Sequence, residues 1–138
     1  MTDATTFGFI GLGVMGEPMC RHLVQKTGAK VVVHDINAEP VARLVQAGAV
    51  DAGSIGGLAK ADIIFISMPS GAHLQKICEM PGGLLEFAHS GQIIVDLSTS
   101  PLKLTRELAT AFAAKGADYA DAPVARTRAA AEAGTLAI

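Results

Sequence analysis

The sequence predicts an α/β protein with a Rossmann-type, doubly wound and mainly parallel sheet, built as a single domain over residues 1–138. Three observations support this fold class. Short apolar segments alternate with helical patterns along the whole chain, which is typical of a parallel sheet covered by helices. Hydrophobic residues make up 50% of the chain and the mean hydropathy is +0.40, as expected when strands are buried on both faces. A glycine-rich turn joins the first apolar segment to the first helical one.

The first strand is predicted over 7–10, where the chain is apolar apart from one glycine. A helix follows, because apolar side chains recur every three to four residues along one face: Met15, Met19, Cys20, Leu23 and Val24. Pro18 is tolerated in the first turn, which lacks internal N–H partners. Gly28 is expected just past the helix end. The second strand covers 30–34 and is closed by Asp35.

The rest of the chain continues the alternation. Helices are predicted over 39–47, 55–60, 72–78, 84–88, 102–114 and 126–133, and strands over 49–50, 63–66, 92–96, 118–121 and from 135 onward. Ser54 is expected to cap the short helix after it, and Ser100 with Pro101 to open the helix over 102–114. Ligands bind such folds at the carboxyl ends of the strands where strand order reverses, so the loops at these ends form the candidate site.

The turn G-x-G-x-x-G at 11–16 predicts a dinucleotide site. Gly11 would make the tight turn, Gly13 would let the backbone approach a pyrophosphate, and Gly16 would let the helix pack closely on the sheet. Asp35, roughly 20 residues farther on, is placed to accept hydrogen bonds from an adenosine ribose. Its charge would repel a 2′-phosphate, and no Arg or Lys follows before Arg43, which favours NAD over NADP. The alternative is a glycine-rich turn beside a solvated aspartate.

Composition argues against several other functions. The net charge is −2 and aromatic residues make up only 4%, so no nucleic-acid partner is expected. No apolar run approaches the ~18 residues of a membrane span, and no basic segment precedes an apolar one at the N-terminus, as a signal peptide would require. Cys20 and Cys78 form no CxxC and are expected to be reduced thiols, which predicts a cytoplasmic location.

Neither a metal site nor a hydrolase nucleophile is predicted. The four histidines have no metal-ligand spacing with one another or with the cysteines: His22, His34, His73 and His89. The chain contains no G-x-S-x-G motif. Asp96 and Asp121 close adjacent strands and could form an acid–base pair, although hydrogen bonding within the loops or helix capping is the favoured role.

Five segments together resemble the β-hydroxyacid dehydrogenases, a family that includes 3-hydroxyisobutyrate dehydrogenase, tartronate semialdehyde reductase and the NAD-binding domain of 6-phosphogluconate dehydrogenase. They are G-F-I-G-L-G-V-M-G at 8–16, M-P at 68–69, D-L-S-T-S-P at 96–101, D-A-P-V at 121–124 and G-T-L at 134–136. The resemblance spans essentially the whole chain. It implies the cofactor-binding domain of an NAD-dependent oxidoreductase that interconverts a small β-hydroxyacid and its semialdehyde by hydride transfer. A non-catalytic dinucleotide-binding or redox-sensing module is the alternative.

The resemblance also implies roles for individual residues. The cofactor-binding residues would be Gly11, Leu12, Gly13, Val14, Met15, Gly16, Asp35, Met68, Pro69 and Thr99. In the family, Val14 and Met15 would touch the pyrophosphate region, and Thr99 would lie near the nicotinamide ribose. Ser98 matches a serine that meets the substrate carboxylate. The alternative role for the segment 98–100 is helix capping.

One departure from the family pattern concerns the substrate pocket. The chain has Ala125, Arg126 and Thr127 where the family commonly has S-G-G, so these three residues are candidate substrate contacts. An arginine there is a fixed cation suited to a carboxylate, phosphate or sulfonate, and the Arg-Thr pair resembles the sulfolactaldehyde reductase branch. The alternative for Arg126 is a solvated position at a helix start.

A second departure concerns catalysis. The general acid of the family is a lysine downstream of G-T-L, at the start of an all-helical second domain, and the 138 residues do not contain that motif. No catalytic residue is therefore assigned, and the chain is expected to be inactive alone. A small anionic hydroxyacid or semialdehyde is the expected substrate of the full enzyme. A homo-oligomer formed through the helical domain is also expected.

Overall fold

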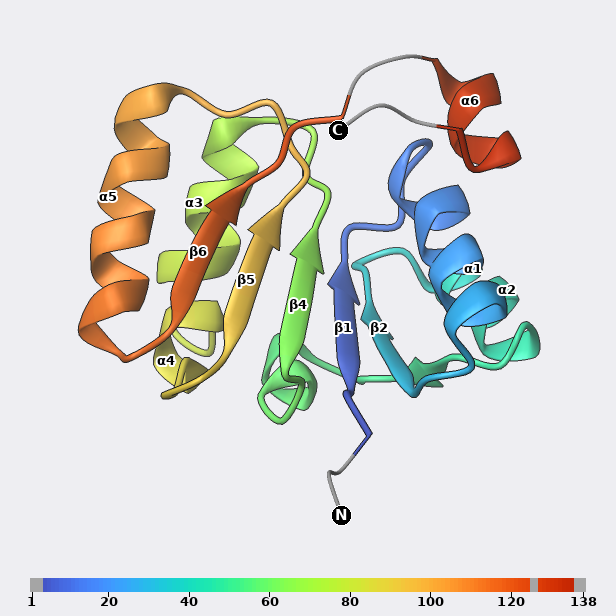
Figure 1. Cartoon of the computed structure of the whole chain (residues 1–138), viewed down its shortest axis with the longest axis horizontal. Helices are drawn as coiled ribbons and strands as arrows, with labels where there is room; N and C mark the ends of the chain where they lie inside the picture. The colour runs from blue at the N-terminus through green and yellow to red at the C-terminus, as the bar shows by residue number, and fades with distance from the viewer. Residues whose placement is uncertain (1–3, 125–126, 136–138) are drawn as a thin grey trace.

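The computed structural model, which describes residues 4–124 and 127–135, confirms the predicted fold class (Figure 1). One sheet has the strand order β3-β2-β1-β4-β5-β6. The strands are β1 (Phe7–Ile10), β2 (Val31–His34), β3 (Val50–Asp51), β4 (Ile63–Ile66), β5 (Ile93–Asp96) and β6 (Asp118–Asp121). The helices are α1 (Gly16–Thr27), α2 (Ala38–Gln46), the 3₁₀ helix η1 (Ile55–Leu58), α3 (Gly71–Glu79), α4 (Leu84–Phe87), α5 (Leu102–Ala114) and α6 (Arg128–Ala133).

The first strand lies at the centre of the sheet. Phe7 is aligned with Val31 of β2 on one side and with Ile63 of β4 on the other, and both pairings are parallel. Strand order therefore reverses between β1 and β4. In doubly wound sheets the crevice outside the carboxyl ends at this reversal is the usual ligand site. The glycine-rich turn leaves β1 at this point, as the sequence predicts.

Each face of the sheet has its own apolar core. On one face Ile64 and Ile94 pack with Leu108 and Phe112 of α5. On the other face Phe9 and Val33 pack with side chains of α1 and α2, among them Cys20 and Leu44. Figure 1 shows α1 and α2 beside β1 and β2, and α3 and α5 beside β4 to β6. Burial on both faces explains the high hydropathy of the strand sequences.

The start of α5 differs from the prediction. Ser54 caps η1 as expected, since its side chain accepts a hydrogen bond from the Gly57 N–H. Ser100, however, does not cap α5: Pro101 occupies the N-cap position and no side chain caps the helix. The Ser100 hydroxyl instead donates to Asp96 at 3.0 Å. Because the N-cap lies one residue later than predicted, Ser100 lies before that position, and its hydroxyl bonds to the buried carboxylate.

The C-terminal segment is described through Thr135. The helix predicted over 126–133 begins at Arg128 and is capped by the Thr127 side chain, which accepts from the Ala130 N–H. The Thr135 N–H donates to the Ala130 carbonyl at 2.8 Å, so this residue closes α6 instead of opening a strand. The remainder of the predicted strand lies outside the described residues. Within the described part of the chain, no helix combines the length and apolarity needed to cross a membrane.

Candidate dinucleotide-binding site

The glycine-rich turn packs tightly against the loop after β4. Gly11 has φ +97°, a conformation that disfavours every residue except glycine, and a Cβ there would overlap the backbone carbonyl of Ser67. A Cβ on Gly16 would overlap the carbonyl of Gly11. Both positions therefore require glycine for packing within the protein. These two contacts set the shape of the turn and bring the ends of β1 and β4 together.

Gly13 has the opposite environment, because it faces open space. A Cβ placed on Gly13 meets no described heavy atom within 4 Å, and its neighbour Val14 is 60% exposed. The helix α1 begins directly after this turn, with Met15 at the N-cap and no side-chain cap. An uncapped helix N-terminus carries unpaired N–H groups and partial positive charge, which favour an anion. The turn thus leaves room for a phosphate where the helix dipole would stabilise one.

Asp35 connects the end of β2 to this turn. One carboxylate oxygen accepts from the Leu12 N–H at 2.7 Å, and the other accepts from the Asn37 N–H at 2.8 Å. The Leu12 side chain is buried in the core, so the contribution of Leu12 to the site is its backbone. Each carboxylate oxygen has further acceptor capacity. Asp35 is therefore held in place by the protein and can still accept bonds from two ribose hydroxyls.

The loops after β4 and β5 are joined by a hydrogen bond. The Ser98 hydroxyl accepts from the Met68 N–H at 2.8 Å, and Ser98 is only 4% exposed. Met68 is half-buried and its methyl group lies close to Gly11, whereas Pro69 and Thr99 are exposed at the same edge of the sheet. The contacts therefore run without a break from Asp35 through Leu12, Gly11 and Met68 to Ser98.

Asp96 holds the loop that carries Ser98 and Thr99. This carboxylate is fully buried and accepts from the Ser98 N–H at 2.9 Å, the Ser100 hydroxyl at 3.0 Å and the Tyr119 hydroxyl at 2.9 Å. Burial and the neighbouring Asp96 charge raise the pKa of Tyr119, so its hydroxyl stays protonated and donates. Hydrogen bonding within the loop is thus the observed role of Asp96. Asp121 is aligned with Asp96 on the neighbouring strand β6 but its side chain is exposed, and the described hydrogen bonds of the Asp96 carboxylate do not include it.

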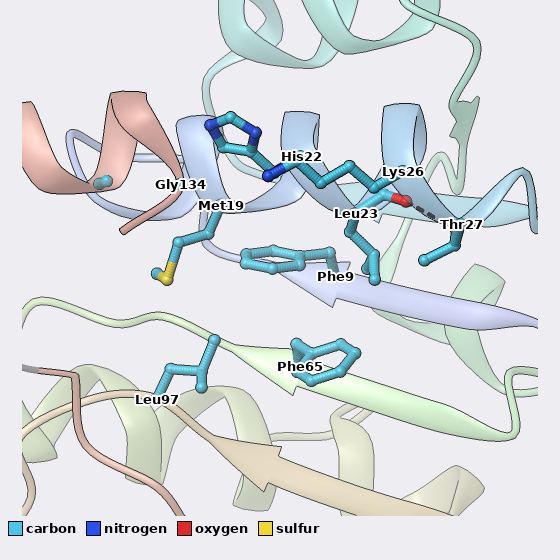
Figure 2. Close-up of a pocket in the computed structure, with 10 residues that line it drawn as sticks. Phe9, Met19, His22, Leu23, Lys26, Thr27, Phe65, Leu97 and Gly134 are labelled. Atoms are coloured by element: carbon cyan, nitrogen blue, oxygen red, sulfur yellow. Dashed lines mark hydrogen bonds between the residues drawn. The ribbon is translucent and has the colours of Figure 1, made fainter. Parts of the chain in front are cut away.

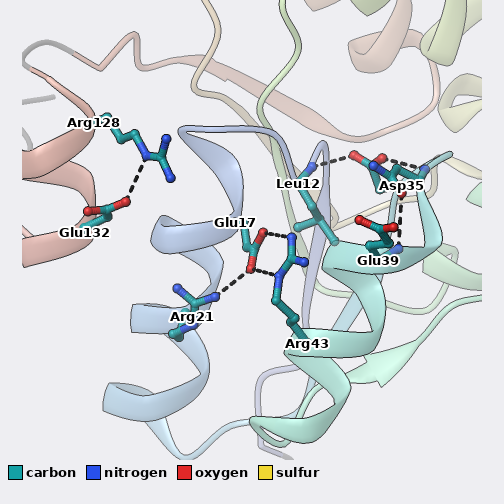
Figure 3. A network of polar contacts seen from close by, with 9 residues as sticks. Leu12, Glu17, Arg21, Asp35, Glu39, Arg43, Arg128 and Glu132 are labelled. Atoms are coloured by element: carbon teal, nitrogen blue, oxygen red, sulfur yellow. Dashed lines mark hydrogen bonds and ion pairs between the residues drawn. The ribbon is translucent and has the colours of Figure 1, made fainter.

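A network of ion pairs borders the glycine-rich turn (Figure 3). Glu17, in the first turn of α1, accepts from both Arg43 and Arg21, and Arg128 pairs with Glu132 on α6. The bond from Arg43 is the main cause that lowers the pKa of Glu17. These side chains line a cavity of about 440 Å³ together with Leu12, Gly13, Val14, Pro18, Asn37 and Pro40. Sequence spacing could have revealed the i, i+4 pair of Glu17 and Arg21, but not the contact with Arg43.

A second, apolar hollow of about 350 Å³ lies on the α1 face of the sheet (Figure 2). Phe9 and Phe65 form its floor, Met19 and Leu23 of α1 line one side, and α6 closes one end. Its lining includes neither the glycine-rich turn nor Asp35. Of the two hollows, the 440 Å³ cavity is the one lined by the glycine-rich turn, so this cavity and the adjacent edge that carries Asp35 form the candidate dinucleotide site.

Three predicted site residues follow the sixth strand. Ala125 and Arg126 lie outside the described residues. Thr127 is exposed, and its side chain accepts from the Ala130 N–H at 3.4 Å as the cap of α6. Among the described residues no three His, Cys, Asp or Glu side chains come together as a metal site would require.

An uncapped helix after a G-x-G-x-x-G turn, with an acidic residue at the end of the second strand, defines a Rossmann-type dinucleotide-binding protein. The family model described as the NAD binding domain of 6-phosphogluconate dehydrogenase matches residues 6–138. The chain belongs to this family, as its resemblance to the β-hydroxyacid dehydrogenases predicts.

Named relatives agree with this assignment. The chain is 40% identical to 2-(hydroxymethyl)glutarate dehydrogenase of Eubacterium barkeri, covering 100% of this chain and 46% of that protein. It is 38% identical to 3-sulfolactaldehyde reductase of Escherichia coli, covering 93% of this chain and 43% of the relative. A solved structure of a complex with NADP⁺ and 2-OPP superposes with a TM-score of 0.88 at 38% identity, over 94% of this chain and 46% of that one. The chain thus spans less than half the length of the relatives it matches.

Proposed function

We propose that this chain binds NAD(H) in preference to NADP(H), as the cofactor-binding part of an enzyme that interconverts a small β-hydroxyacid and its semialdehyde. One observation carries the proposal: the unbroken line of contacts from Asp35 through Leu12, Gly11 and Met68 to Ser98. A dinucleotide would lie along this line. Its adenosine ribose would bind at Asp35, its pyrophosphate at Gly13, and its nicotinamide end near Thr99. Gly11, Leu12, Gly13, Val14, Met15, Gly16, Met68 and Pro69 complete the proposed cofactor contacts.

The adenosine end has chemistry that suits this ligand. Asp35 supplies two acceptors for the ribose hydroxyls, and its charge disfavours a 2′-phosphate. Ile36, which follows it, has a fully exposed side chain. An apolar side chain at that position offers a surface for the flat face of adenine. Ile36 adds a contact that the sequence motifs do not predict.

The substrate end is proposed to lie beyond Ser98 and Thr99, toward the residues that follow β6. Ser98, Ala125, Arg126 and Thr127 are the proposed substrate contacts. Arg126 would recognise an anionic group, because a guanidinium can pair with a carboxylate, phosphate or sulfonate through two parallel bonds. The names of two relatives fit such a substrate, since one is a hydroxymethylglutarate dehydrogenase and the other a sulfolactaldehyde reductase.

Hydride transfer to a carbonyl leaves an alkoxide that needs a proton. We assign no general acid within the 138 residues, so we propose that the proton comes from a lysine in the part of the relatives that this chain does not span. Homo-oligomerisation is proposed for the same part. A dinucleotide-binding module without catalysis is the second candidate function, because the contacts described above account for dinucleotide binding alone.

Binding and turnover test the two functions separately. Calorimetric titration of the chain with NAD⁺ and NADP⁺ should show binding of both with the lower Kd for NAD⁺. Equal or tighter binding of NADP⁺ would contradict the cofactor preference. Assay with NADH and a panel of small semialdehydes should show negligible turnover by the chain and measurable turnover by a version extended through the next domain. Comparable turnover by both would place the general acid within residues 1–138.

A further inference from the structure

The cavity at the proposed adenosine end is lined by three arginines and two glutamates. Leu12, Gly13 and Asn37 mark the corner where the ribose would lie, and Arg21, Arg43 and Arg128 line the same cavity. Guanidinium groups bind phosphates well through their planar fork of N–H donors. A free arginine here would attract the 2′-phosphate of NADP and oppose the effect of Asp35. Whether these arginines are paired with carboxylates therefore bears directly on cofactor choice.

Glu17 occupies two of the three arginines. Its Oε1 lies 2.7 Å from Arg43 Nη2, and its Oε2 lies 2.7 Å from Arg43 Nε and 2.6 Å from Arg21 Nη2. The bond pair with Arg43 is bidentate, which uses the fork that would otherwise bind a phosphate. The Glu17 side chain is 14% exposed, against 53% for Arg43. Glu17 is thus the more buried partner, and its carboxylate fixes the position of the Arg43 guanidinium.

The remaining cation is also paired. Arg128 Nε lies 2.9 Å from a carboxylate oxygen of Glu132, one turn farther along α6. Each arginine among the described residues of this cavity therefore has a carboxylate partner. Figure 3 shows the guanidinium of Arg43 directed at Glu17, with Asp35 on the other side of Leu12.

We propose that Glu17 is a specificity-determining residue, which excludes NADP by holding Arg43 and Arg21 in ion pairs away from the ribose corner. Asp35 would repel the 2′-phosphate, and Glu17 would withhold the cations that could compensate. Glu17 acts through the arginines and is not proposed to touch the cofactor. The inference rests on the proposed function, because it concerns the cofactor of that same site.

Replacing Glu17 by glutamine tests this role. Glu17→Gln keeps the shape of the side chain but removes the charge, so Arg43 loses its bidentate carboxylate partner and keeps only the electrostatic attraction of Glu39, four residues earlier on α2. NADP⁺ should then bind about 10-fold more tightly than to the wild-type chain, because charge-assisted bonds to a phosphate become available. NAD⁺ affinity should rise by a clearly smaller factor, since its pyrophosphate near Gly13 can also attract a freed arginine but it carries no 2′-phosphate. Calorimetry with both dinucleotides at low ionic strength measures the two values.

Two further variants separate the ion pair from general charge. Glu107→Gln, on α5 beside Lys103, makes the same change in net charge outside this cavity and should leave both affinities unchanged. The double variant Glu17→Gln with Arg43→Gln should lose most of the gain in NADP⁺ affinity. An unchanged NADP⁺/NAD⁺ ratio in Glu17→Gln, or an equal gain in Glu107→Gln, would overturn the proposal.

A third variant covers the case in which Glu17→Gln fails to fold. Arg43→Gln alone should leave NADP⁺ affinity within about 2-fold of wild type, because Glu17 already occupies the guanidinium. A larger loss would show that Arg43 contacts the phosphate in the wild-type chain and would also overturn the inference. Failure of the wild-type chain to bind either dinucleotide would instead refute the proposed function, and the inference with it.

Discussion

The carboxylate of Asp35 lies 2.7 Å from the backbone N–H of Leu12, and this bond joins the end of β2 to the glycine-rich turn that follows β1. The two segments are separated by the whole of α1 in the sequence. The residue proposed to bind the ribose therefore also fixes the turn proposed to bind the pyrophosphate. Loss of the Asp35 charge should therefore weaken both the binding of the ribose and the hydrogen bond that holds the glycine-rich turn.

Asp35→Asn should narrow the preference for NAD⁺ over NADP⁺. The amide oxygen can still accept from Leu12, but the negative charge that repels a 2′-phosphate is gone. NAD⁺ affinity should fall about 10-fold, since charge-assisted bonds are worth roughly 1.5–3 kcal/mol and neutral ones less. Asp51→Asn, at the end of β3 where Asp51 accepts from the Gly53 N–H, is the matched control. A variant that kept the wild-type ratio of the two affinities would show that Asp35 does not set the preference.

Gly13→Val should abolish dinucleotide binding with little loss of stability, because the added side chain enters open space that the pyrophosphate needs. Gly11→Val is the contrasting variant. Its Cβ overlaps the Ser67 carbonyl at a positive φ, so we expect a loss of more than about 2 kcal/mol in the free energy of unfolding. Thermal unfolding and calorimetric titration of both variants distinguish these effects. Retained affinity in Gly13→Val would remove the turn from the site.

Tyr119→Phe should destabilise the fold by about 1–3 kcal/mol, since Asp96 is fully buried and would lose one of its three donors. The ring contact with Phe112, whose centroid is 5.6 Å away, is retained in the variant. Thr110→Ala removes an exposed hydroxyl from α5 and should change stability by less than about 0.5 kcal/mol. Urea unfolding of the three proteins gives the comparison, and equal stabilities would mean that Asp96 does not need the Tyr119 bond.

Cys20 and Cys78 should resist thiol reagents in the native protein. Burial raises the pKa of each thiol to about 12, so the reactive thiolate at pH 8 amounts to about one part in ten thousand. Ellman's reagent should label both thiols rapidly in denaturant and neither rapidly without it. Fast labelling of the folded chain would indicate that α1 or α3 opens readily.

Glu17 should contribute to stability in a pH-dependent way. The Arg43 bond lowers the pKa of Glu17 below its usual 4.5, so folding favours the charged form. Its contribution is fully present above that usual pKa and is lost as pH falls through the lower folded value. Glu17→Gln should therefore be less stable than wild type at pH 7, by up to about 1 kcal/mol, and this difference should shrink toward pH 3. A difference independent of pH would contradict a charged Glu17 as its source.

Local patterns in the sequence predict most of the fold. Buried parallel strands are short apolar runs. Gly28 ends α1 with a positive φ as predicted, and Gly134 ends α6 in the same conformation. The glycine-rich turn is also a local signal, because its shape depends on residues next to one another. The family resemblance rests on such local motifs, and the match of the family model over residues 6–138 confirms it. The assignment of individual site residues stays a prediction, as does a cytoplasmic location.

Contacts between distant segments could not be predicted. Glu17 and Arg43 come from different helices, so no spacing rule joins them. Ser100 looks like a helix cap when only its sequence neighbours are considered. In the fold its hydroxyl donates to the buried Asp96 at the end of β5, which also accepts from Tyr119 of β6. Ser98 likewise has a partner, Met68, from another loop. Each of these features depends on tertiary packing, which propensity and periodicity do not describe.

The central position of β1 has a consequence for how the chain folds during synthesis. Strand β1 pairs with β4, whose residues leave the ribosome only after β2, α2 and η1. Until then, one edge of an apolar strand has no partner, and such unpaired edges promote aggregation in folding intermediates. Because parallel pairings with long sequence separation form slowly, a nascent chain stalled before β4 has left the ribosome should depend on chaperones more strongly than one stalled after β4 has emerged.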